Sequence, residues 1–433
     1  MPRSDGLDRR ALLFVVISWF AVACNSQSVE IVGTAGSVAR DDSDVLFDTS
    51  IEGAPGDSTP PDDDTAEQQP VQPDLFQADR TWAFSLQVED DAWDELERDG
   101  RNYVPAVLEW ETTQIDVQIH IKGSSSWQSI NDKPALVVDI NRVDPQQEFM
   151  QVKKFYLQND CYDPSMMSST LSYQYYREWG YPASQTSFAT LAVNGRDYGL
   201  YVVLEAHNDD FLESWFGDPN GNLYENAEAY CDVTDLACME IEEYDEGNHA
   251  AFEQLGQAAL TRPDEWLAAI QGAVDYQRLV EAFALEMSLV HWDSYSYDLS
   301  NYQLYHEPTT DKFTLLTQSM DLDYGFRPWS YPNCGQYGMD LDNYDMGLLA
   351  SGCIRDPVCH DAVVEAVERY AGLLELAGGA DRVRALDERI GDAVRADPKR
   401  YYSNNDYERH VACLQTFFDE RPGQLREWVA QQR

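Results

Sequence analysis

The stretch from His291 to Phe326 constrains the fold most, because two acidic loops flank two short apolar strands within it. A loop with Asp293, Asp298 and Asn301 comes first, and the two strands are joined by a polar turn. Asp321-Leu322-Asp323 then follows directly after the second strand. The stretch therefore predicts an acidic loop, a hairpin and a second acidic loop in succession.

Apolar residues at helical spacing precede this stretch, between Tyr276 and Val290, after a plausible N-cap at Asp275. This order, with a helix followed by an acidic loop, a hairpin and a second acidic loop, is the layout of kinase-like phosphoryl-transfer sites. In those sites Asp residues and an Asn hold magnesium against the phosphates. Apolar neighbours are expected to half-bury Asp321 and Asp323, and adjacent buried carboxylates are stabilised most simply by a divalent cation. A calcium site and a plain acidic surface loop are the alternatives.

The net charge is extreme, at −47 with a pI near 4.2. Such a surface repels DNA, RNA and anionic lipids, so nucleic-acid binding is not expected. Most of the Asp and Glu side chains are interpreted as a solubilising surface. A surface with this negative charge tolerates cationic partners and divalent metals.

The first 24 residues are typical of a lipoprotein-type signal peptide. Arg9 and Arg10 precede a short apolar run that ends in Ala21-Val22-Ala23-Cys24, which resembles a bacterial lipobox. The prediction is an exported lipoprotein at the cell surface or in the periplasm, lipidated at Cys24 and touching the membrane only through that anchor. An ordinary cleaved signal with an incidental cysteine is the alternative.

Residues 25–78 lack hydrophobic periodicity and are rich in Asp, Ser, Pro, Gly and Gln, which predicts a disordered acidic linker. The folded domain is predicted to span residues 79–433. Beyond Cys24, seven cysteines remain. In an exported protein they suggest disulfides, with Cys231–Cys238 and Cys353–Cys359 as close-spaced pairs, and the odd number predicts one free thiol.

Alternating apolar residues predict a mostly antiparallel sheet in the first half of the domain. Its strands are expected at 82–88, 103–110, 114–122, 134–140, 153–157, 188–193 and 199–205. Asn194-Gly195 is a strong hairpin signal between the last two. Helices are predicted at 90–96, 165–178 and 207–215, and the chain beyond Gly247 is predicted to be mainly helical apart from the hairpin within 291–326.

A small-residue turn follows the third strand, at Gly123-Ser124-Ser125-Ser126, and its backbone N–H groups are suited to phosphate oxygens. Lys122 and Lys133 flank it in a chain where lysine is scarce. The lysines predicted to contact phosphate are Lys133 first, then Lys153 and Lys154, and Lys122 is predicted to belong to the same site. Glu205 closes an apolar strand and is a candidate partner for such a lysine. Plain turns, surface lysines and a surface glutamate are the alternatives.

These motifs, in this order, resemble the CotH kinase family over about residues 82–330. The resemblance is carried by Asp91-Ala92-Trp93, Ile121-Lys122-Gly123-Ser124-Ser125-Ser126, Lys133-Pro134, Lys154-Phe155-Tyr156-Leu157, Val193-Asn194-Gly195, Tyr198-Gly199-Leu200-Tyr201, Glu205, Gly221-Asn222-Leu223-Tyr224, Trp292-Asp293, Asn301-Tyr302 and Asp321-Leu322-Asp323. It implies an α+β, divergent protein-kinase-like fold. The expected lobes are a mostly antiparallel β N-terminal lobe at about 79–215 and a mainly helical C-terminal lobe at about 216–433.

The resemblance also implies roles for single residues. Asp293 would be the catalytic base, Asn301 and Asp321 would bind the metal with Asp323 beside them, and Lys133 would contact phosphate with Glu205 as its partner. The loop from Asp293 to Asn301 is longer than the kinase catalytic loop, which leaves Asp298 as a rival base.

The activity implied by the resemblance is transfer of the γ-phosphate of ATP, with Mg²⁺ or Mn²⁺, to Ser or Thr hydroxyls of surface or secreted proteins. The alternative is a surface scaffold or adhesion lipoprotein that keeps the fold without turnover.

Overall fold

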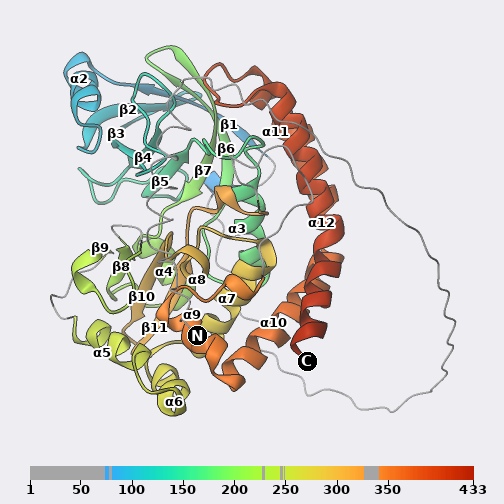
Figure 1. The fold of residues 1–433 in the computed structure, drawn as a ribbon. Helices are drawn as coiled ribbons and strands as arrows, with labels where there is room; N and C mark the ends of the chain where they lie inside the picture. Colours follow the sequence, from blue (N-terminus) through green and yellow to red (C-terminus); the bar gives the residue numbers. More distant parts are fainter. Residues whose placement is uncertain (1–73, 78–79, 227–229, 244–246, 248, 326–340) are drawn as a thin grey trace, which may run out of the picture.

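A closed β-barrel forms the first half of the described chain, and a second sheet with most of the helices forms the rest (Figure 1). The computed structural model describes residues 74–77, 80–226, 230–243, 247, 249–325 and 341–433. The signal peptide, Cys24, almost all of the predicted linker and Phe326 lie outside these residues. Of the linker, Asp74–Phe76 forms a 3-10 turn whose Leu75 and Phe76 are buried against the barrel.

The barrel strands follow the order β1-β2-β3-β4-β5-β7-β6. Their bounds are β1 (Thr81–Gln87), β2 (Val104–Trp110), β3 (Thr113–Lys122), β4 (Ala135–Asp139), β5 (Lys154–Gln158), β6 (Thr186–Val193) and β7 (Arg196–Glu205). All seven were expected from the sequence, within a few residues at each end.

The predicted two-lobed, kinase-like fold with a mostly antiparallel β N-terminal lobe is wrong. The seven strands close into a barrel because β1 pairs in parallel with β6, from Thr81 opposite Phe188 to Leu86 opposite Val193. Closure removes both edges of the sheet and encloses the inward side chains of β1 and β6 in one core. Alternation reveals which face of a strand is apolar, but not which distant strand it pairs with.

The strand β7 is apolar on both faces because it separates two cores. Tyr201 and Val203 point into the barrel core, whereas Leu200, Val202 and Leu204 belong to the large core that the helices build. The continuous apolar run of β7 is the pattern of a strand covered on both sides. The barrel and the helical half are therefore packed together along this strand.

The second half of the domain contains many helices, as expected, together with a four-stranded sheet in the order β11-β10-β8-β9. Its strands are β8 (Leu223–Asn226), β9 (Met239–Glu243), β10 (Tyr302–Glu307) and β11 (Lys312–Thr317). The β10–β11 hairpin was predicted, but β8 is only four residues long and β9 has only two apolar residues, so both strand signals are short. The result is a mixed α+β fold.

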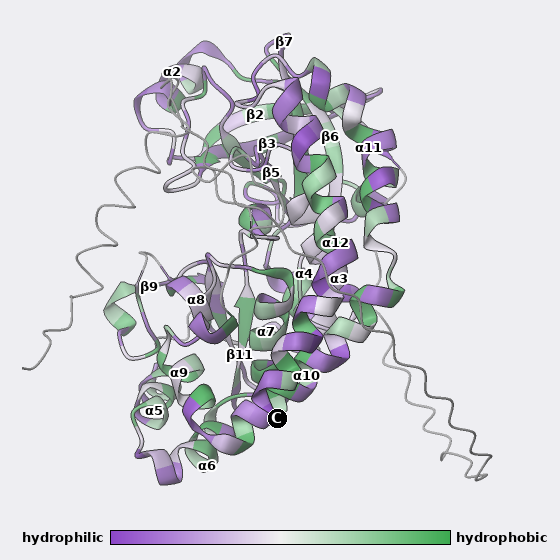
Figure 2. Ribbon diagram, turned by 45° about the vertical axis from the view of Figure 1, so that its right-hand side comes forward, coloured by the Kyte–Doolittle hydropathy of each residue, from purple (hydrophilic) through white to green (hydrophobic). Residues whose placement is uncertain are grey.

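The helices pack on this sheet and along the barrel. They are α2 (Asp90–Arg98), α3 (Ser168–Glu178), α4 (Asp209–Phe216), α5 (Ala250–Ala259), α6 (Pro263–Ala273), α7 (Tyr276–Leu289), α8 (Tyr295–Asp298), α9 (Leu348–Arg355), α10 (Pro357–Leu376), α11 (Gly379–Ala396) and α12 (Asn404–Gln432). α12 runs along one side of the molecule, and its hydrophilic and hydrophobic residues alternate around the helix (Figure 2). Among the described helices, none combines the length and the apolar character that a bilayer crossing requires.

A buried ion pair joins the C-terminal helices to the barrel. The Lys133 ammonium lies 2.5 Å from the Asp397 carboxylate, and both side chains are almost completely buried. Asp397 follows α11 and also accepts a hydrogen bond from the backbone N–H of Leu200 in β7 at 3.0 Å. The loop between α11 and α12 is thereby fixed against the barrel.

We expect Asp397→Ala to lower the free energy of unfolding by about 3–5 kcal/mol, because it leaves the Lys133 charge buried without its partner. Urea denaturation followed by circular dichroism measures this. Asp392→Ala, on the exposed face of α11, is the control and should unfold as the wild-type chain does. Equal stability of the two variants would contradict the role of the ion pair.

Candidate functional site

The acidic loop after α7 is organised by Glu286, which is completely buried in that helix. Its Oε2 accepts hydrogen bonds from the Ser294 hydroxyl at 2.9 Å, the Ser296 N–H at 3.2 Å and the Ser296 hydroxyl. Thr317 of β11 donates to Oε1 at 3.4 Å. One carboxylate therefore links the loop to both the helix before it and the hairpin after it.

The C-terminal end of α7 is also fixed from outside. Val290 adopts a left-handed conformation with φ of 56°, and the buried guanidinium of Arg421 in α12 donates to the carbonyls of Met287 and Ser288. Capping by a cation satisfies carbonyls that lack a partner within the helix. The direction in which the chain leaves α7 toward Asp293 is thus set by α12.

Asp293 and Asn301 are brought together, as predicted. The Asn301 amide donates to the Asp293 carboxylate Oδ2 and to the Asp293 carbonyl, both at 2.7 Å. Burial raises the pKa of Asp293 to about 6, although His291 and hydrogen bonds from Asn301 and Asp298 lower it. The rival base Asp298 therefore lies in the same hydrogen-bonded group as Asp293.

Asp323 is completely buried and serves as a connector. Its Oδ1 lies 2.6 Å from Nδ1 of His291, and its Oδ2 accepts a hydrogen bond from Ser172 of α3 at 2.5 Å. Burial alone would lower the pKa of His291, but the carboxylates of Asp323, Glu286 and Asp293 raise it to about 9. Asp323 thus neutralises the buried imidazolium of His291. Its carboxylate, which was predicted to lie beside the metal, is therefore already engaged in an ion pair.

The β10–β11 hairpin places Asp321 beside Asn301. Tyr302 pairs with Thr317, and the Gln318 N–H donates to the Asn301 carbonyl at 2.9 Å, so the acidic loops meet at one end of the hairpin. Asp321 is half-buried. Burial raises its pKa well above the ordinary value, and the carboxylates of Asp160, Asp163 and Asp293 raise it further.

Lys122, at the end of β3, supplies a cation that faces this acidic group. Burial lowers its pKa, whereas the carboxylates of Glu225 and Asp321 raise it, and its ammonium lies 4.4 Å from the centre of the Tyr156 ring. The adjoining turn begins at Gly123, whose φ of 106° is a conformation that other residues rarely adopt. Ser124 and Ser125 of this turn are exposed.

Lys153 and Lys154, which were also predicted to contact phosphate, are paired with acids. Lys153 is paired with Asp209 and Asp210, and Lys154 lies 3.3 Å from Glu243.

Lys133 and Glu205 have other partners as well. Lys133 is paired with Asp397, as described above. Glu205 accepts hydrogen bonds from the backbone and side chain of Gln185 and lies 3.8 Å from Arg177. The structure therefore does not bring Lys133 and Glu205 together, and their roles toward phosphate stay predictions.

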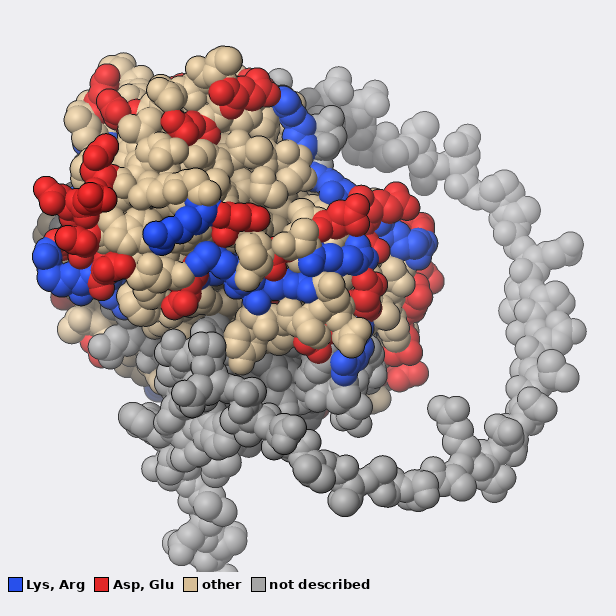
Figure 3. All heavy atoms as spheres, turned by 90° about the horizontal axis from the view of Figure 1, so that it is seen from above, with Lys and Arg blue, Asp and Glu red and all other residues tan. Residues whose placement is uncertain are grey.

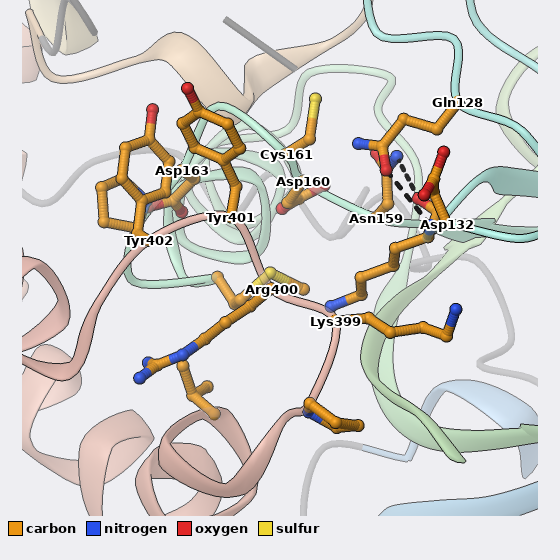
Figure 4. Close-up of a pocket in the computed structure, with 15 residues that line it drawn as sticks. Gln128, Asp132, Asn159, Asp160, Cys161, Asp163, Lys399, Arg400, Tyr401 and Tyr402 are labelled. Atoms are coloured by element: carbon orange, nitrogen blue, oxygen red, sulfur yellow. Dashed lines mark hydrogen bonds between the residues drawn. The ribbon is translucent and has the colours of Figure 1, made fainter. Parts of the chain in front are cut away.

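A cavity of about 380 Å³ lies between the barrel and the loop that joins α11 to α12. Asp160 and Cys161 lie on one side of it and Lys399 and Arg400 on the other (Figure 4). Lys133 also lines it.

Two disulfides confirm the close-spaced cysteine pairs, Cys231–Cys238 and Cys353–Cys359. The first borders the site, because the Cys231 carbonyl accepts a hydrogen bond from the hydroxyl of Tyr302, the residue after Asn301. Cys413 is disulfide-bonded as well, and Cys161 is buried and stands outside these disulfides.

Sequence reasoning missed Glu286, Asp160 and Asp397. A glutamate within an apolar helical face is a signal for Glu286, since buried carboxylates need partners. Asp160 and Asp397 are two of 77 Asp and Glu residues, and no sequence pattern distinguishes them from the others.

The residues at Asp321 fit a metal that takes some of its ligands from elsewhere. Among the described residues, no group of three or more His, Cys, Asp and Glu side chains is arranged to hold a metal ion alone. Asn301 is engaged through its amide N–H group, so these two hydrogen bonds leave its Oδ1 for a ligand. Mg²⁺ is commonly held by one or two carboxylates together with water and substrate phosphates.

The family model described as "CotH kinase protein" matches residues 119–425. The inner spore coat protein H of Bacillus subtilis (strain 168) is 21% identical over 362 residues, which cover 78% of this chain and 90% of that protein.

We expect Glu286→Ala to lower the free energy of unfolding by about 2–4 kcal/mol, because Ser294 and Ser296 lose a buried charged acceptor. Hydrogen exchange should also speed up at residues 294–298. Chemical denaturation and exchange mass spectrometry measure the two effects. Glu253→Ala, at an exposed position of α5, should change neither, and an unaltered loop in Glu286→Ala would refute the organising role.

Proposed function

This chain belongs to the family described as CotH kinase protein, and we propose that it transfers the γ-phosphate of ATP to Ser or Thr hydroxyls of exported proteins. The observation that carries the proposal is the meeting of Asp293, Asn301 and Asp321 at one end of a hairpin, opposite Lys122. Phosphoryl transfer needs little covalent chemistry from the protein, so positioning and charge are sufficient.

Asp293 is the proposed base. Its carboxylate would accept the proton of the acceptor hydroxyl as that oxygen bonds to the γ-phosphorus and the bond from phosphorus to the departing ADP breaks. Asn301 donates to Asp293 Oδ2 and so fixes the rotation of the carboxylate. A base held in position by a second residue is the usual arrangement for proton transfer.

Asp321 and the Asn301 Oδ1 are the proposed ligands of Mg²⁺ or Mn²⁺. When bound, the divalent ion neutralises charge on the phosphate oxygens. Burial disfavours the charged form of Asp321, and three neighbouring carboxylates repel it. A bound cation would offset both effects.

Lys122 is the proposed phosphate-contacting lysine, with Lys133 as the alternative. Lys122 adjoins the exposed Gly123-Ser124-Ser125 turn and faces the Asp321 carboxylate, whereas the Lys133 ammonium is already neutralised by Asp397. An ammonium in a half-buried position acts on phosphate more strongly than one in bulk water.

Similarity to a spore coat protein and the presence of disulfides are compatible with an exported or surface protein. Anchoring by a lipid at Cys24 and the identity of the acceptor proteins remain proposals.

We expect Asp293→Asn to reduce phosphate transfer by about 10²–10⁴-fold, because the hydroxyl proton loses its acceptor. Asp321→Ala should abolish transfer. Purified chain with labelled ATP and Mg²⁺ or Mn²⁺, scored for labelling of itself and of a generic acceptor, measures this. Asp311→Asn, on the exposed turn of the same hairpin, should remain fully active.

Asp298→Asn separates the two possible bases, because it should retain transfer if Asp293 is the base. A wild-type chain that labels nothing and shows no nucleotide-dependent melting shift would favour the scaffold alternative.

For Lys122→Met we expect a loss of about 10²-fold or more in kcat/KM for ATP, comparable to the removal of one charge-stabilising donor. Lys153→Met is the matched control, because Lys153 is paired with Asp209 and Asp210. If instead Lys133→Met loses transfer while remaining folded and Lys122→Met does not, the assignment passes to Lys133.

A further inference from the structure

Asp160 stands at a bend between β5 and α3. Its φ is 39°, and its carbonyl accepts the N–H of Asp163 at 2.9 Å. The preceding residue, Asn159, donates to the Lys133 carbonyl at 2.8 Å, which fixes the segment to the barrel. The bend holds the Asp160 side chain in a defined place.

The Asp160 carboxylate is buried, and one of its oxygens has no hydrogen-bond partner. The side chain is 5% exposed, Ser169 hydrogen-bonds to the carboxylate, and Oδ2 is left unsatisfied. Asp160 also lines the cavity between the barrel and the loop that joins α11 to α12. Leaving a buried carboxylate oxygen unpaired is costly, so such an atom indicates a missing partner.

The neighbouring acid, Asp163, is already committed to the backbone. It accepts hydrogen bonds from the N–H groups of Ser165, Met167 and Ser168 and from the Ser165 hydroxyl, at 2.6–2.8 Å. These contacts cap the N-terminus of α3. Asp163 is therefore a structural residue, and Asp160 is the acid of this segment with capacity for a ligand.

Helix α3 brings Asp160 close to Asp321. The helix packs against the turn that contains Asp321, and Ser172 of α3 donates to Asp323 at 2.5 Å. Tyr173 hydrogen-bonds to the backbone of Ser319. Ser169, in the first turn of the same helix, hydrogen-bonds to the Asp160 carboxylate, so α3 contacts both acidic segments.

The nearby lysines only partly offset this charge. Lys133 is paired with Asp397, and Lys122 also faces Glu225 and Glu242. Carboxylates held near one another repel, and a divalent cation between them removes the repulsion.

We propose that Asp160 is a second carboxylate ligand, with Asp321, of the divalent cation that accompanies the nucleotide. Water and phosphate oxygens would supply the remaining positions, as is common for Mg²⁺. The inference rests on the proposed function, since it concerns the metal of the same site.

The test is calorimetric titration of Mn²⁺ into the full chain saturated with a non-hydrolysable ATP analogue. Asp160→Asn should weaken Mn²⁺ binding by at least about tenfold, the size of effect that the loss of a supporting group at a metal site produces. Asp132→Asn, an exposed position on the same cavity, should bind Mn²⁺ as the wild-type chain does. In metal-free buffer, Asp160→Asn should melt no lower than wild type, because it removes one of two like charges.

Unchanged Mn²⁺ affinity in a folded Asp160→Asn chain overturns the inference and leaves the proposed function standing. A wild-type chain that binds no Mn²⁺ with the nucleotide analogue overturns both. Iron-mediated cleavage of the wild-type chain gives an answer that does not depend on any variant. Fe²⁺ with ascorbate and peroxide should cut the backbone near both residue 160 and residue 321, and cuts near 321 alone would reject Asp160.

Discussion

The buried pairing of His291 with Asp323 is the contact on which the site depends. Both side chains are completely excluded from water, and their 2.6 Å contact joins the end of α7 to the loop after β11. Ser172 brings α3 to the same carboxylate. Removing either charge would leave the other buried and unpaired, which is strongly destabilising. The acidic loops thus hold their positions through an ion pair that need not touch any substrate.

Local elements could be predicted from the sequence, because each rests on short-range patterns. Alternation in β3 and the Asn194-Gly195 turn between β6 and β7 both gave the right strands. The parallel pairing of β1 with β6 could not be predicted, because it joins residues about a hundred positions apart and depends on barrel closure. The strands β8, which has four residues, and β9, which is largely acidic, were not predicted, because their stability comes from pairing with neighbouring strands.

The candidate site was predictable to the extent that its residues share one stretch. Asp293, Asn301 and Asp321 lie within 30 positions, and a hairpin between two acidic loops brings them together. Lys122 and Asp160 come from the barrel side, so only the tertiary fold reveals that they face Asp321. High net charge adds a difficulty, because acids are everywhere in this chain. The surface is nevertheless not uniformly acidic, since Lys and Arg side chains form a band on the face seen in Figure 3.

The choice between two lysines shows how burial changes the meaning of a charged residue. Both Lys122 and Lys133 flank the Gly-Ser turn, and sequence alone favoured Lys133. A fully buried ammonium must be neutralised within the protein, and Asp397 does this for Lys133 at 2.5 Å. Phosphate would then have to compete with a carboxylate that is also bound to β7 through Leu200. Lys122 remains half-buried beside an exposed turn, so it can approach an anion without first breaking a buried pair. The same physics separates Asp163, whose oxygens are consumed by a helix cap, from Asp160, whose Oδ2 is not satisfied. In a chain this acidic, the useful charges are those that the fold leaves incompletely paired.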